Sequence, residues 1–371
     1  MKGTVIKRGQ SWSVVVDAGR DEDGKRLRKW HSGYATKKAA EEARIVILSS
    51  LQRGEYVPPS KQTLGEWLEV WLEGRTGLAD TTRDGYEYEV KRVSKTLGSR
   101  RLRDVTPAIL ADFYRQLTEQ GLSAKTIKNC HGVTHKAFAD AVRDGVLSRN
   151  PADNVELPRS ERPKTETWSA DELSRFLHHC ESSHRLSAAF LLLCSTGMRR
   201  SEVLGVRWEN LDLDGARVAV VDTVVPVKNK PVLRIGETKS RRSRRVIALD
   251  SRTVAALRDH KRRQNEERLR AGPAWVGLNL VFADELGGIV SPDIFTRTMK
   301  RLAGEAGVKP LTPHSGARHT WATLALSSGI HPKVVQERLG HSSIAITLDR
   351  YSHVINGMDR DAAETVAALI Q

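Results

Sequence analysis

The sequence predicts a multidomain protein that is mainly α-helical and carries small β-sheets. The chain has 371 residues, which is too long for one ordinary hydrophobic core. Proline-containing polar stretches near residues 58–60 and 158–163 divide it into three segments. Alternating strand patterns occupy only short stretches, whereas apolar residues elsewhere recur at helical spacing. We therefore expect domains at residues 1–57, 61–157 and 165–371.

The first segment, residues 1–57, is expected to form a three-stranded sheet followed by a helix. Three short alternating runs are strand candidates: residues 5–8, 11–16 and 26–31. The alanine-rich, periodic run at 37–51 predicts a helix that packs on one face of this sheet. Arg26 and Arg28 lie on the third strand and can enter a DNA major groove, as β-ribbons do. A small module with a solvated charged face fits the pattern nearly as well.

The middle segment, residues 61–157, is expected to be all-helical. Thr63 and Glu66 have the spacing of a capping box, which predicts the start of a helix. Three further helices are expected, at residues 81–97, 107–119 and 123–143. Basic residues cluster near the end of the second helix and in the following turn, and they include Lys91, Arg92, Arg100 and Arg101. Such a cluster can bind DNA phosphates, and a solvated helix end explains it equally well.

The last segment, residues 165–371, is expected to be a mixed α+β domain. Ser169 and Glu172 form a second capping box, a buried helix follows, and a new helix is expected at 199–208. A period-two region predicts three strands, at residues 217–227, 232–236 and 244–249. The last two of these strands are expected to form a β-hairpin whose turn holds Lys239. The remainder of the chain is expected to be helical.

The charge of the chain indicates a polyanionic partner. The formal net charge is +15 and the isoelectric point is near 9.9. The basic excess is present in each of the three segments, which favours nucleic acid lying along the whole chain. A merely soluble basic protein is the alternative on charge alone.

Membrane insertion and disulfide chemistry are not expected. No apolar run approaches the roughly 20 residues needed to cross a bilayer, and the N-terminus lacks a signal-peptide pattern. We therefore expect a cytoplasmic protein with no membrane partner. Cys130, Cys180 and Cys194 are odd in number, widely spaced and set in mostly apolar surroundings. That pattern predicts reduced thiols instead of a disulfide framework or a zinc site.

Four pieces of the last segment are polar where a helix or strand does not require it. The pieces are residues 196–202, 237–246, 312–320 and 339–353. The first places Arg199 at a predicted helix start, where a guanidinium fork can meet an anion. Glu202 follows three residues later, on the same helix face. Taken alone, a turn lysine such as Lys239 is usually solvated and a lone tyrosine such as Tyr351 usually packs, so the inference rests on the combination.

Together, these pieces resemble the catalytic domain of the tyrosine recombinases, most closely the phage-type integrases. The order and approximate spacing agree over about residues 165–360. The matching residues are Arg199, Lys239, Arg318, His341 and Tyr351, with His353 in a Tyr-x-His sequence. The resemblance implies that Tyr351 attacks DNA and forms a 3′-phosphotyrosyl link. It also implies that Lys239 protonates the leaving 5′-oxygen and that His341 donates to the phosphate.

The residue types suit this chemistry on physical grounds. Transesterification by a tyrosine hydroxyl needs stabilised charge on the non-bridging oxygens, a donor for the leaving oxygen and removal of the phenolic proton. Arg199 and Arg318 can supply forked, permanently charged donors. Because the phosphotyrosyl link stores the bond, the reaction requires neither a metal nor a nucleotide cofactor.

One piece departs from the family pattern. The family usually has a His or Lys three residues before its second arginine, but here Ser315 has that spacing and His314 lies four residues before Arg318. Either a one-residue insertion still delivers His314 to the site, or the acid/base group is absent. We favour the insertion, because Gly316 can adopt an unusual backbone angle.

The resemblance also implies partners. It predicts that residues 1–57 bind arm-type sites and residues 61–157 bind core-type sites on double-stranded DNA. It further predicts a homotetramer on DNA, an accessory DNA-bending protein and a directionality factor. The tail at 354–371 either packs as a helix on its own domain or docks on a neighbouring protomer. The alternatives for function are a type IB topoisomerase-like enzyme, against which the arm-like segment argues, and a DNA-binding regulator impaired at His314.

Overall fold

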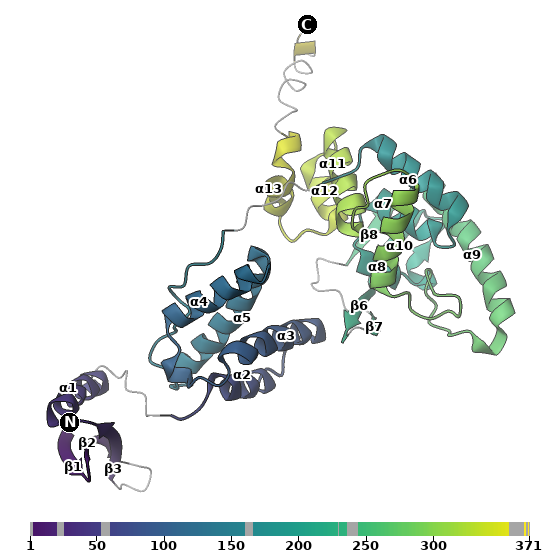
Figure 1. Ribbon diagram of the computed structural model, residues 1–371. Helices are drawn as coiled ribbons and strands as arrows, with labels where there is room; N and C mark the ends of the chain where they lie inside the picture. Colours follow the sequence, from purple (N-terminus) through teal and green to yellow (C-terminus); the bar gives the residue numbers. More distant parts are fainter. Residues whose placement is uncertain are drawn as a thin grey trace. The chain divides into compact units, whose positions relative to one another are not determined.

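The computed structural model describes most of the chain, which is mainly helical with small antiparallel sheets, as predicted (Figure 1). The described residues are 3–20, 26–52, 60–159, 166–228, 230–235, 244–355, 367–368 and 370. The chain divides into two compact units, residues 1–162 and 163–371. Among the described residues, no helix is long and apolar enough to span a membrane.

The first part of the chain forms the predicted three-stranded antiparallel sheet with one helix. The elements are β1 (Gly3–Arg8), β2 (Ser11–Arg20), β3 (Arg26–Tyr34) and α1 (Lys37–Gln52). The strands pair in the order β1-β2-β3, and α1 packs against β1 and β2. Val14, Val16 and Ala40 are fully buried between sheet and helix, so this small module has a hydrophobic core of its own.

Four helices follow, as predicted: α2 (Leu64–Glu73), α3 (Asp80–Leu97), α4 (Pro107–Glu119) and α5 (Ala124–Arg143). The capping box at the start of α2 is confirmed: Glu66 N donates to Thr63 Oγ1 at 3.2 Å, and Thr63 N donates to Glu66 Oε2 at 2.8 Å. Trp67 Nε1 donates to the Ala137 carbonyl at 3.0 Å, which ties α2 to α5. These helices share a second, separate core.

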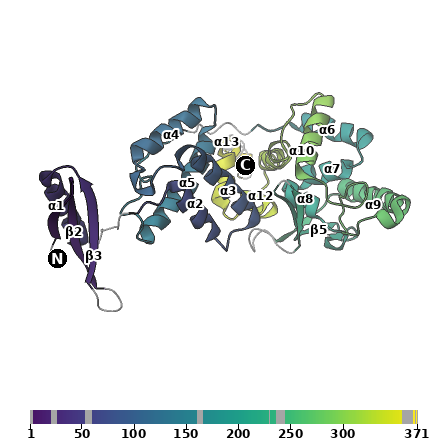
Figure 2. The same cartoon turned by 60° about the horizontal axis from the view of Figure 1, so that its bottom comes forward.

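The second unit is built around α7, whose residues are nearly all buried. Its helices are α6 (Ala170–Ser183), α7 (Ser187–Thr196), α8 (Arg200–Gly205), α9 (Ser251–Ala271), α10 (Pro292–Glu305), α11 (Thr320–Ser327), α12 (Pro332–Leu339) and α13 (Ile344–Ile355). Helix α7 contacts α6, α8, α9 and α11. Figure 2 shows α6, α8 and α9 around it. Phe190 of α7 stacks on Phe295 at 4.7 Å and meets Phe176 edge-on at 5.9 Å. This apolar centre holds the elements that carry the candidate site.

The strands of this unit differ from the prediction. They are β4 (Leu211–Asp212), β5 (Arg217–Val220), β6 (Thr223–Val227), β7 (Lys230–Arg234) and β8 (Arg245–Ala248). The predicted strand 217–227 is two strands, because Asp222 between them is buried and accepts a hydrogen bond from Asn210 at 2.9 Å. One sheet has the order β4-β5-β8, and β6 pairs with β7. The predicted hairpin of 232–236 with 244–249 is therefore wrong: the segment between them connects two sheets.

The helix predicted at 199–208 is also shorter than expected. Helix α8 ends at Gly205, and Trp208–Asn210 forms a separate 3₁₀ turn. A Cβ on Gly205 would lie 2.7 Å from backbone atoms of Asp222 and Thr223. The close approach of β6 to the end of α8 therefore requires glycine at this position.

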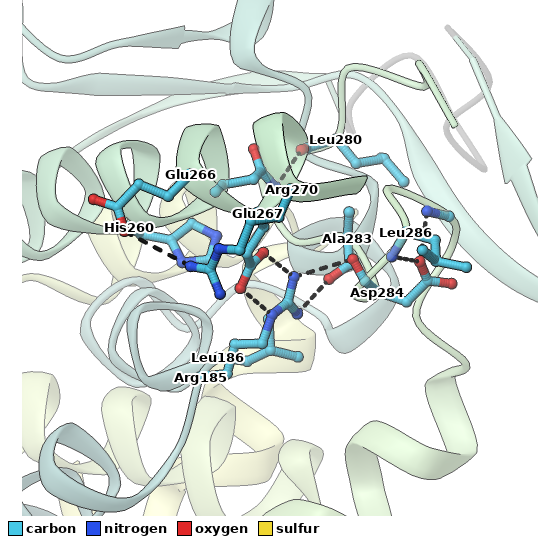
Figure 3. Close-up of polar contacts among 12 residues, drawn as sticks. Arg185, Leu186, His260, Glu266, Glu267, Arg270, Leu280, Ala283, Asp284 and Leu286 are labelled. Carbon is cyan, nitrogen blue, oxygen red and sulfur yellow. Dashed lines mark hydrogen bonds and ion pairs between the residues drawn. The ribbon is translucent and has the colours of Figure 1, made fainter. Parts of the chain in front are cut away.

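A polar network anchors α9 to the segment that follows it, away from the candidate site (Figure 3). Arg185 donates from Nε and Nη2 to the two carboxylate oxygens of Glu267, each at 2.6 Å, and from Nη1 to the Ala283 carbonyl at 2.7 Å. His260 Nε2 lies 2.7 Å from the Val281 carbonyl. Burial lowers the pKa of His260 to about 4, so its neutral ring donates this bond at neutral pH.

The Arg185 network predicts a local loss of stability on truncation. In Arg185→Ala, Glu267 loses a bidentate partner in a largely buried setting, which should destabilise α9 and residues 280–286 by roughly 1.5–3 kcal/mol. Amide hydrogen exchange of the full chain measures the local stability of α9 and residues 280–286. Arg252→Ala is the matched control, because its pair with Glu181 is solvent-exposed and should contribute far less. Equal losses in the two variants would contradict the interpretation.

Candidate active site

The candidate site lies where α8, the turn before α11, α12 and α13 meet. Helix α7 ends at Gly197, whose φ of 66° is the left-handed conformation typical of a helix C-cap. A Cβ here would lie 2.8 Å from Leu339 and 3.1 Å from Trp321. The glycine therefore allows the chain that carries Arg199 to pass directly over the end of α12.

Arg199 presents a partly exposed guanidinium at the N-terminus of α8. Its backbone N–H donates to Glu202 Oε2 at 2.8 Å, and its Nη1 donates to Glu202 Oε1 at 2.7 Å. Its Nη2 donates to the Gly340 carbonyl at 3.3 Å. The side chain is 38% exposed, so the cation is oriented by Glu202 but still open to solvent. The predicted same-face relation of Arg199 and Glu202 is confirmed.

Arg318 is a buried cation beside Arg199. It is 1% exposed and donates from Nη1 to the Gly197 carbonyl at 2.9 Å and from Nη2 to the Leu339 carbonyl at 2.7 Å. Burial, followed by the positive charge of Arg199, lowers the pKa of Arg318 to about 9, which leaves it charged at neutral pH. Arg199, Arg318 and His314 line one pocket. Two guanidiniums in one concave site attract an anion such as a phosphate.

The extra residue before Arg318 is absorbed by a π-helical turn, Pro313–His319. A π-helix closes its hydrogen bonds over five residues instead of four, so it accommodates an inserted residue without turning the following side chains away. His314 consequently lies against His319, with ring centroids 4.3 Å apart, and reaches the pocket. Partial burial, followed by the charges of nearby arginines, lowers the pKa of His314 to about 4.

Gly316 plays a different part from the one predicted. It is not among the glycines with positive φ, so it does not supply an unusual backbone angle. A Cβ on Gly316 would instead lie 3.0 Å from both Leu311 and the Trp168 ring. The glycine is needed because the turn packs tightly on Trp168, and the prediction about its backbone was wrong.

His341 lies in the connection between α12 and α13, and Tyr351 lies in α13. His341 Nδ1 lies 2.9 Å from Thr347 Oγ1, and burial together with Arg318 lowers the pKa of His341 to about 3. Tyr351 is 1% exposed and packs on the end of α12 and on α11. The helix is kinked at Tyr351, where φ is −119° and ψ is 16°. Burial raises the pKa of Tyr351 to about 12.

Three residues of the site were not predicted as functional. His319 Nδ1 lies 2.6 Å from Tyr351 Oη, and Arg350 Nη1 lies 3.2 Å from His319 Nε2. Arg245 donates from Nη2 to Glu202 Oε2 at 2.8 Å and from Nε to the Arg338 carbonyl at 2.7 Å. His319 and Arg350 directly adjoin a matched motif residue, and Arg245 follows the predicted lysine turn. That adjacency was the only sequence signal, because nothing in the sequence shows their contacts.

Other predicted residues belong to the first unit or are not described. Lys239 falls outside the described residues, as does the side chain of His353. Lys91, Arg100, Arg101 and Arg28 are exposed in the first unit, and the side chain of Arg26 is not described. Arg92 is less available for a phosphate, because it pairs with Glu89 and lies over the Tyr88 ring.

Comparison with known proteins agrees with this architecture. The model of the phage integrase family matches residues 166–357. The chain belongs to this family. An arm DNA-binding domain model matches residues 5–51, and a phage integrase N-terminal SAM-like domain model matches 63–118. The chain is 32% identical to a XerC-like tyrosine recombinase of Caldanaerobacter subterraneus subsp. tengcongensis, over 98% of each chain. It is 28% identical to an integrase of Streptomyces ambofaciens, over 93% of this chain and 90% of that one.

Solved integrase structures share the fold. The Tn1549 transposon integrase, in complex with transposon right end DNA, has a TM-score of 0.70 at 24% identity, covering 82% of this chain and all of that one. A λ integrase dimer bound to a core site has a TM-score of 0.58 at 18% identity, covering 94% of each. This family member is thus a tyrosine recombinase, an enzyme of DNA strand transesterification that acts in site-specific recombination of mobile elements. The resemblance found in the sequence is confirmed.

The buried carboxylate of Glu202 predicts a large effect on stability. Burial raises its pKa, but the hydrogen bond and charge of Arg245, with the charge of Arg199, outweigh this and hold the pKa below its ordinary value. Glu202→Gln removes the carboxylate charge that pairs with the largely buried guanidinium of Arg245, which should cost roughly 3–5 kcal/mol. Denaturant unfolding of the full chain measures the loss. Glu181→Gln, in an exposed pair with Arg252, is the control and should change stability far less.

Proposed function

We propose that this recombinase cleaves DNA with Tyr351, through a 3′-phosphotyrosyl intermediate, while Arg199 and Arg318 bind the scissile phosphate. The observation that carries the proposal is the single pocket lined by both guanidiniums and His314. Arg199 is oriented by Glu202, and Arg318 is oriented by two backbone carbonyls. Neither cation must reorganise to meet charge that develops on the phosphate, and such preorganised donors are the strongest form of electrostatic catalysis.

His341 is proposed as a further donor to the phosphate. Its lowered pKa makes it a neutral imidazole at neutral pH, with one N–H. When Thr347 donates to Nδ1, the hydrogen lies on Nε2 and is available to a non-bridging oxygen. His314, held at the pocket by the π-helical turn, is proposed as the acid/base group of this segment.

Lys239 is proposed to protonate the leaving 5′-oxygen. The segment that carries it ends at β8, where Arg245 is bound to Glu202 beneath Arg199. One end of the segment is therefore held beside the phosphate-binding arginines. The Tyr351 side chain is buried in this conformation, so attack requires the groups that cover it to open to DNA.

The proposed substrate is double-stranded DNA with two kinds of attachment site. Residues 1–57 would bind arm-type sites through Arg26 and Arg28, and residues 61–157 would bind core-type sites through Lys91, Arg92, Arg100 and Arg101, of which Arg92 is the least available. Solved relatives include a λ integrase tetramer bound to a Holliday junction, which supports a homotetramer here. A DNA-bending protein and a directionality factor are the proposed accessory partners. The proposed location is the cytoplasm, in contact with the DNA.

Trapping of a covalent complex tests the proposal. A nicked DNA substrate, from which the fragment beyond the cut diffuses away, should accumulate a protein–DNA adduct with the unmodified chain. Tyr351→Phe removes the nucleophilic oxygen and should abolish the adduct. Tyr114→Phe is the matched control, because Tyr114 is also 1% exposed but lies in the core of the other unit. An adduct formed by Tyr351→Phe would show that the nucleophile is misassigned.

The same preparation distinguishes the alternatives. Relaxation of any supercoiled plasmid without site preference would favour the topoisomerase-like enzyme. Sequence-specific binding without cleavage under any condition would favour the impaired regulator.

The role of Lys239 has a separate test. Lys239→Ala should slow cleavage by about 10²–10⁴-fold, as expected for a lost general acid. A substrate with sulfur in place of the leaving 5′-oxygen should restore the rate, because a thiolate departs without being protonated. Lys230→Ala, an exposed lysine of β7, should cleave both substrates normally. Failure of the sulfur substrate to rescue Lys239→Ala would exclude the leaving-group role.

A further inference from the structure

A chain of two hydrogen bonds ends on the hydroxyl of Tyr351. Arg350 Nη1 lies 3.2 Å from His319 Nε2, and His319 Nδ1 lies 2.6 Å from Tyr351 Oη. His319 is 3% exposed and Tyr351 is 1% exposed, so water does not compete freely for the bond between them, whereas Arg350 is exposed. Neither His319 nor Arg350 has a part in the mechanism proposed above.

The donor in each of these bonds follows from the chemistry of the groups. A guanidinium can only donate, so His319 Nε2 must accept from Arg350 through its lone pair. A neutral imidazole has one N–H and one lone pair, so the hydrogen of His319 lies on Nδ1. Nδ1–H then donates to Tyr351 Oη, so His319 does not accept the phenolic hydrogen.

The surroundings keep this ring neutral and fixed in orientation. Burial, followed by the charged and titratable groups around the ring, lowers the pKa of His319 to about 3. Those groups are His314, Arg350, Arg318 and His341. The His314 ring meets His319 edge-on, with an interplanar angle of 73°, which restricts rotation of the imidazole. His319 therefore faces Tyr351 as the tautomer that Arg350 favours, with its hydrogen on Nδ1.

We infer that His319 is a catalytic hydrogen-bond donor to the nucleophilic oxygen, and that Arg350 is a positioning residue that holds His319 in the donor tautomer. The inference rests on the proposed role of Tyr351 as the nucleophile. During attack, Oη forms the bond to phosphorus, the bond from phosphorus to the 5′-oxygen breaks, and that oxygen takes up a proton. The phenolic proton passes to water or to a non-bridging phosphate oxygen, because Nδ1 already carries a hydrogen.

A hydrogen-bond donor to Tyr351 Oη replaces the stabilisation by water that the phenolate loses when the tyrosine is buried. Burial raises the pKa of Tyr351, since a phenolate is poorly solvated in an apolar setting. A hydrogen bond to the charged form lowers the pKa again and stabilises charge that develops on Oη. The opposite assignment, with His319 as the base that receives the phenolic proton, would require a free lone pair on Nδ1, which the bond from Arg350 disfavours.

Two substitutions of His319 distinguish a hydrogen-bond donor to Tyr351 from a general base that removes its proton. Asparagine places an amide N–H₂ near the position of Nδ1–H, whereas aspartate presents only acceptors. With the nicked substrate and the full chain, His319→Asn should keep at least about a tenth of the cleavage rate, and His319→Asp should lose about 10²–10³-fold. The rise in rate with pH that reports ionisation of Tyr351 should move to higher pH in His319→Asp, because Oη has lost its donor. Faster cleavage by His319→Asp than by His319→Asn would overturn the inference in favour of a base.

Substitutions of Arg350 test the positioning role. Arg350→Lys keeps a donor for Nε2 and should cleave within a few-fold of the unmodified chain, whereas Arg350→Leu should be slower by about tenfold or more. The rates are measured at saturating DNA, and gel-shift affinity is measured in parallel, because a merely phosphate-binding arginine would change affinity and leave the saturated rate intact. That second pattern would overturn the role of Arg350.

The role of Tyr351 as the nucleophile is tested independently of the role of His319. An adduct with Tyr351→Phe would refute the proposed function itself. An adduct that requires Tyr351 but forms equally fast in both His319 variants and the unmodified chain would refute only the donor role. Thermal unfolding of each variant identifies any that fail to fold. In that case His319→Gln replaces His319→Asn as the amide donor, and His319→Glu replaces His319→Asp as the acceptor-only variant.

Discussion

The carboxylate of Glu202 is buried between the guanidiniums of Arg199 and Arg245, and most of the candidate site depends on this interaction. A buried charge is tolerated only when it is paired and hydrogen-bonded, so the carboxylate constrains both arginines. Arg199 belongs to the start of α8 and Arg245 to β8, and Arg245 also donates to the end of α12 through the Arg338 carbonyl. One carboxylate thus joins three elements that are distant in the sequence. Arg199 and Arg318 both line the pocket, and their positive charge suits a phosphate.

Burial, followed by the positive charge of the site, explains why the histidines around the pocket are neutral. His314, His319 and His341 all have lowered pKa values, and in each the burial of the ring acts together with the charge of Arg318. A neutral imidazole can both donate and accept, whereas an imidazolium can only donate. The arginines therefore provide the charge. The histidines provide hydrogen bonds in which each ring nitrogen donates or accepts according to its neighbours.

The π-helical turn shows how an inserted residue can be kept without loss of geometry. It places His314 at the pocket and Arg318 and His319 in the interior within seven residues, Pro313–His319. Such turns are uncommon because their hydrogen bonds are poorer, and they persist where the surrounding packing stabilises them. Here the packing is that of Gly316 against the Trp168 ring. The irregular turn and the departure from the family motif are thus the same feature.

The sequence by itself determined the fold class, most of the helices and the family. Capping boxes such as that of Thr63 and Glu66 are local signals between residues a few positions apart, so they can be read without the fold. The pairing of β5 with β8, the second partner of Glu202 and the contact of His319 with Tyr351 were decided only by tertiary structure. These contacts join residues far apart in the chain, and alternation or adjacency in sequence does not show which distant neighbour a strand or side chain will meet.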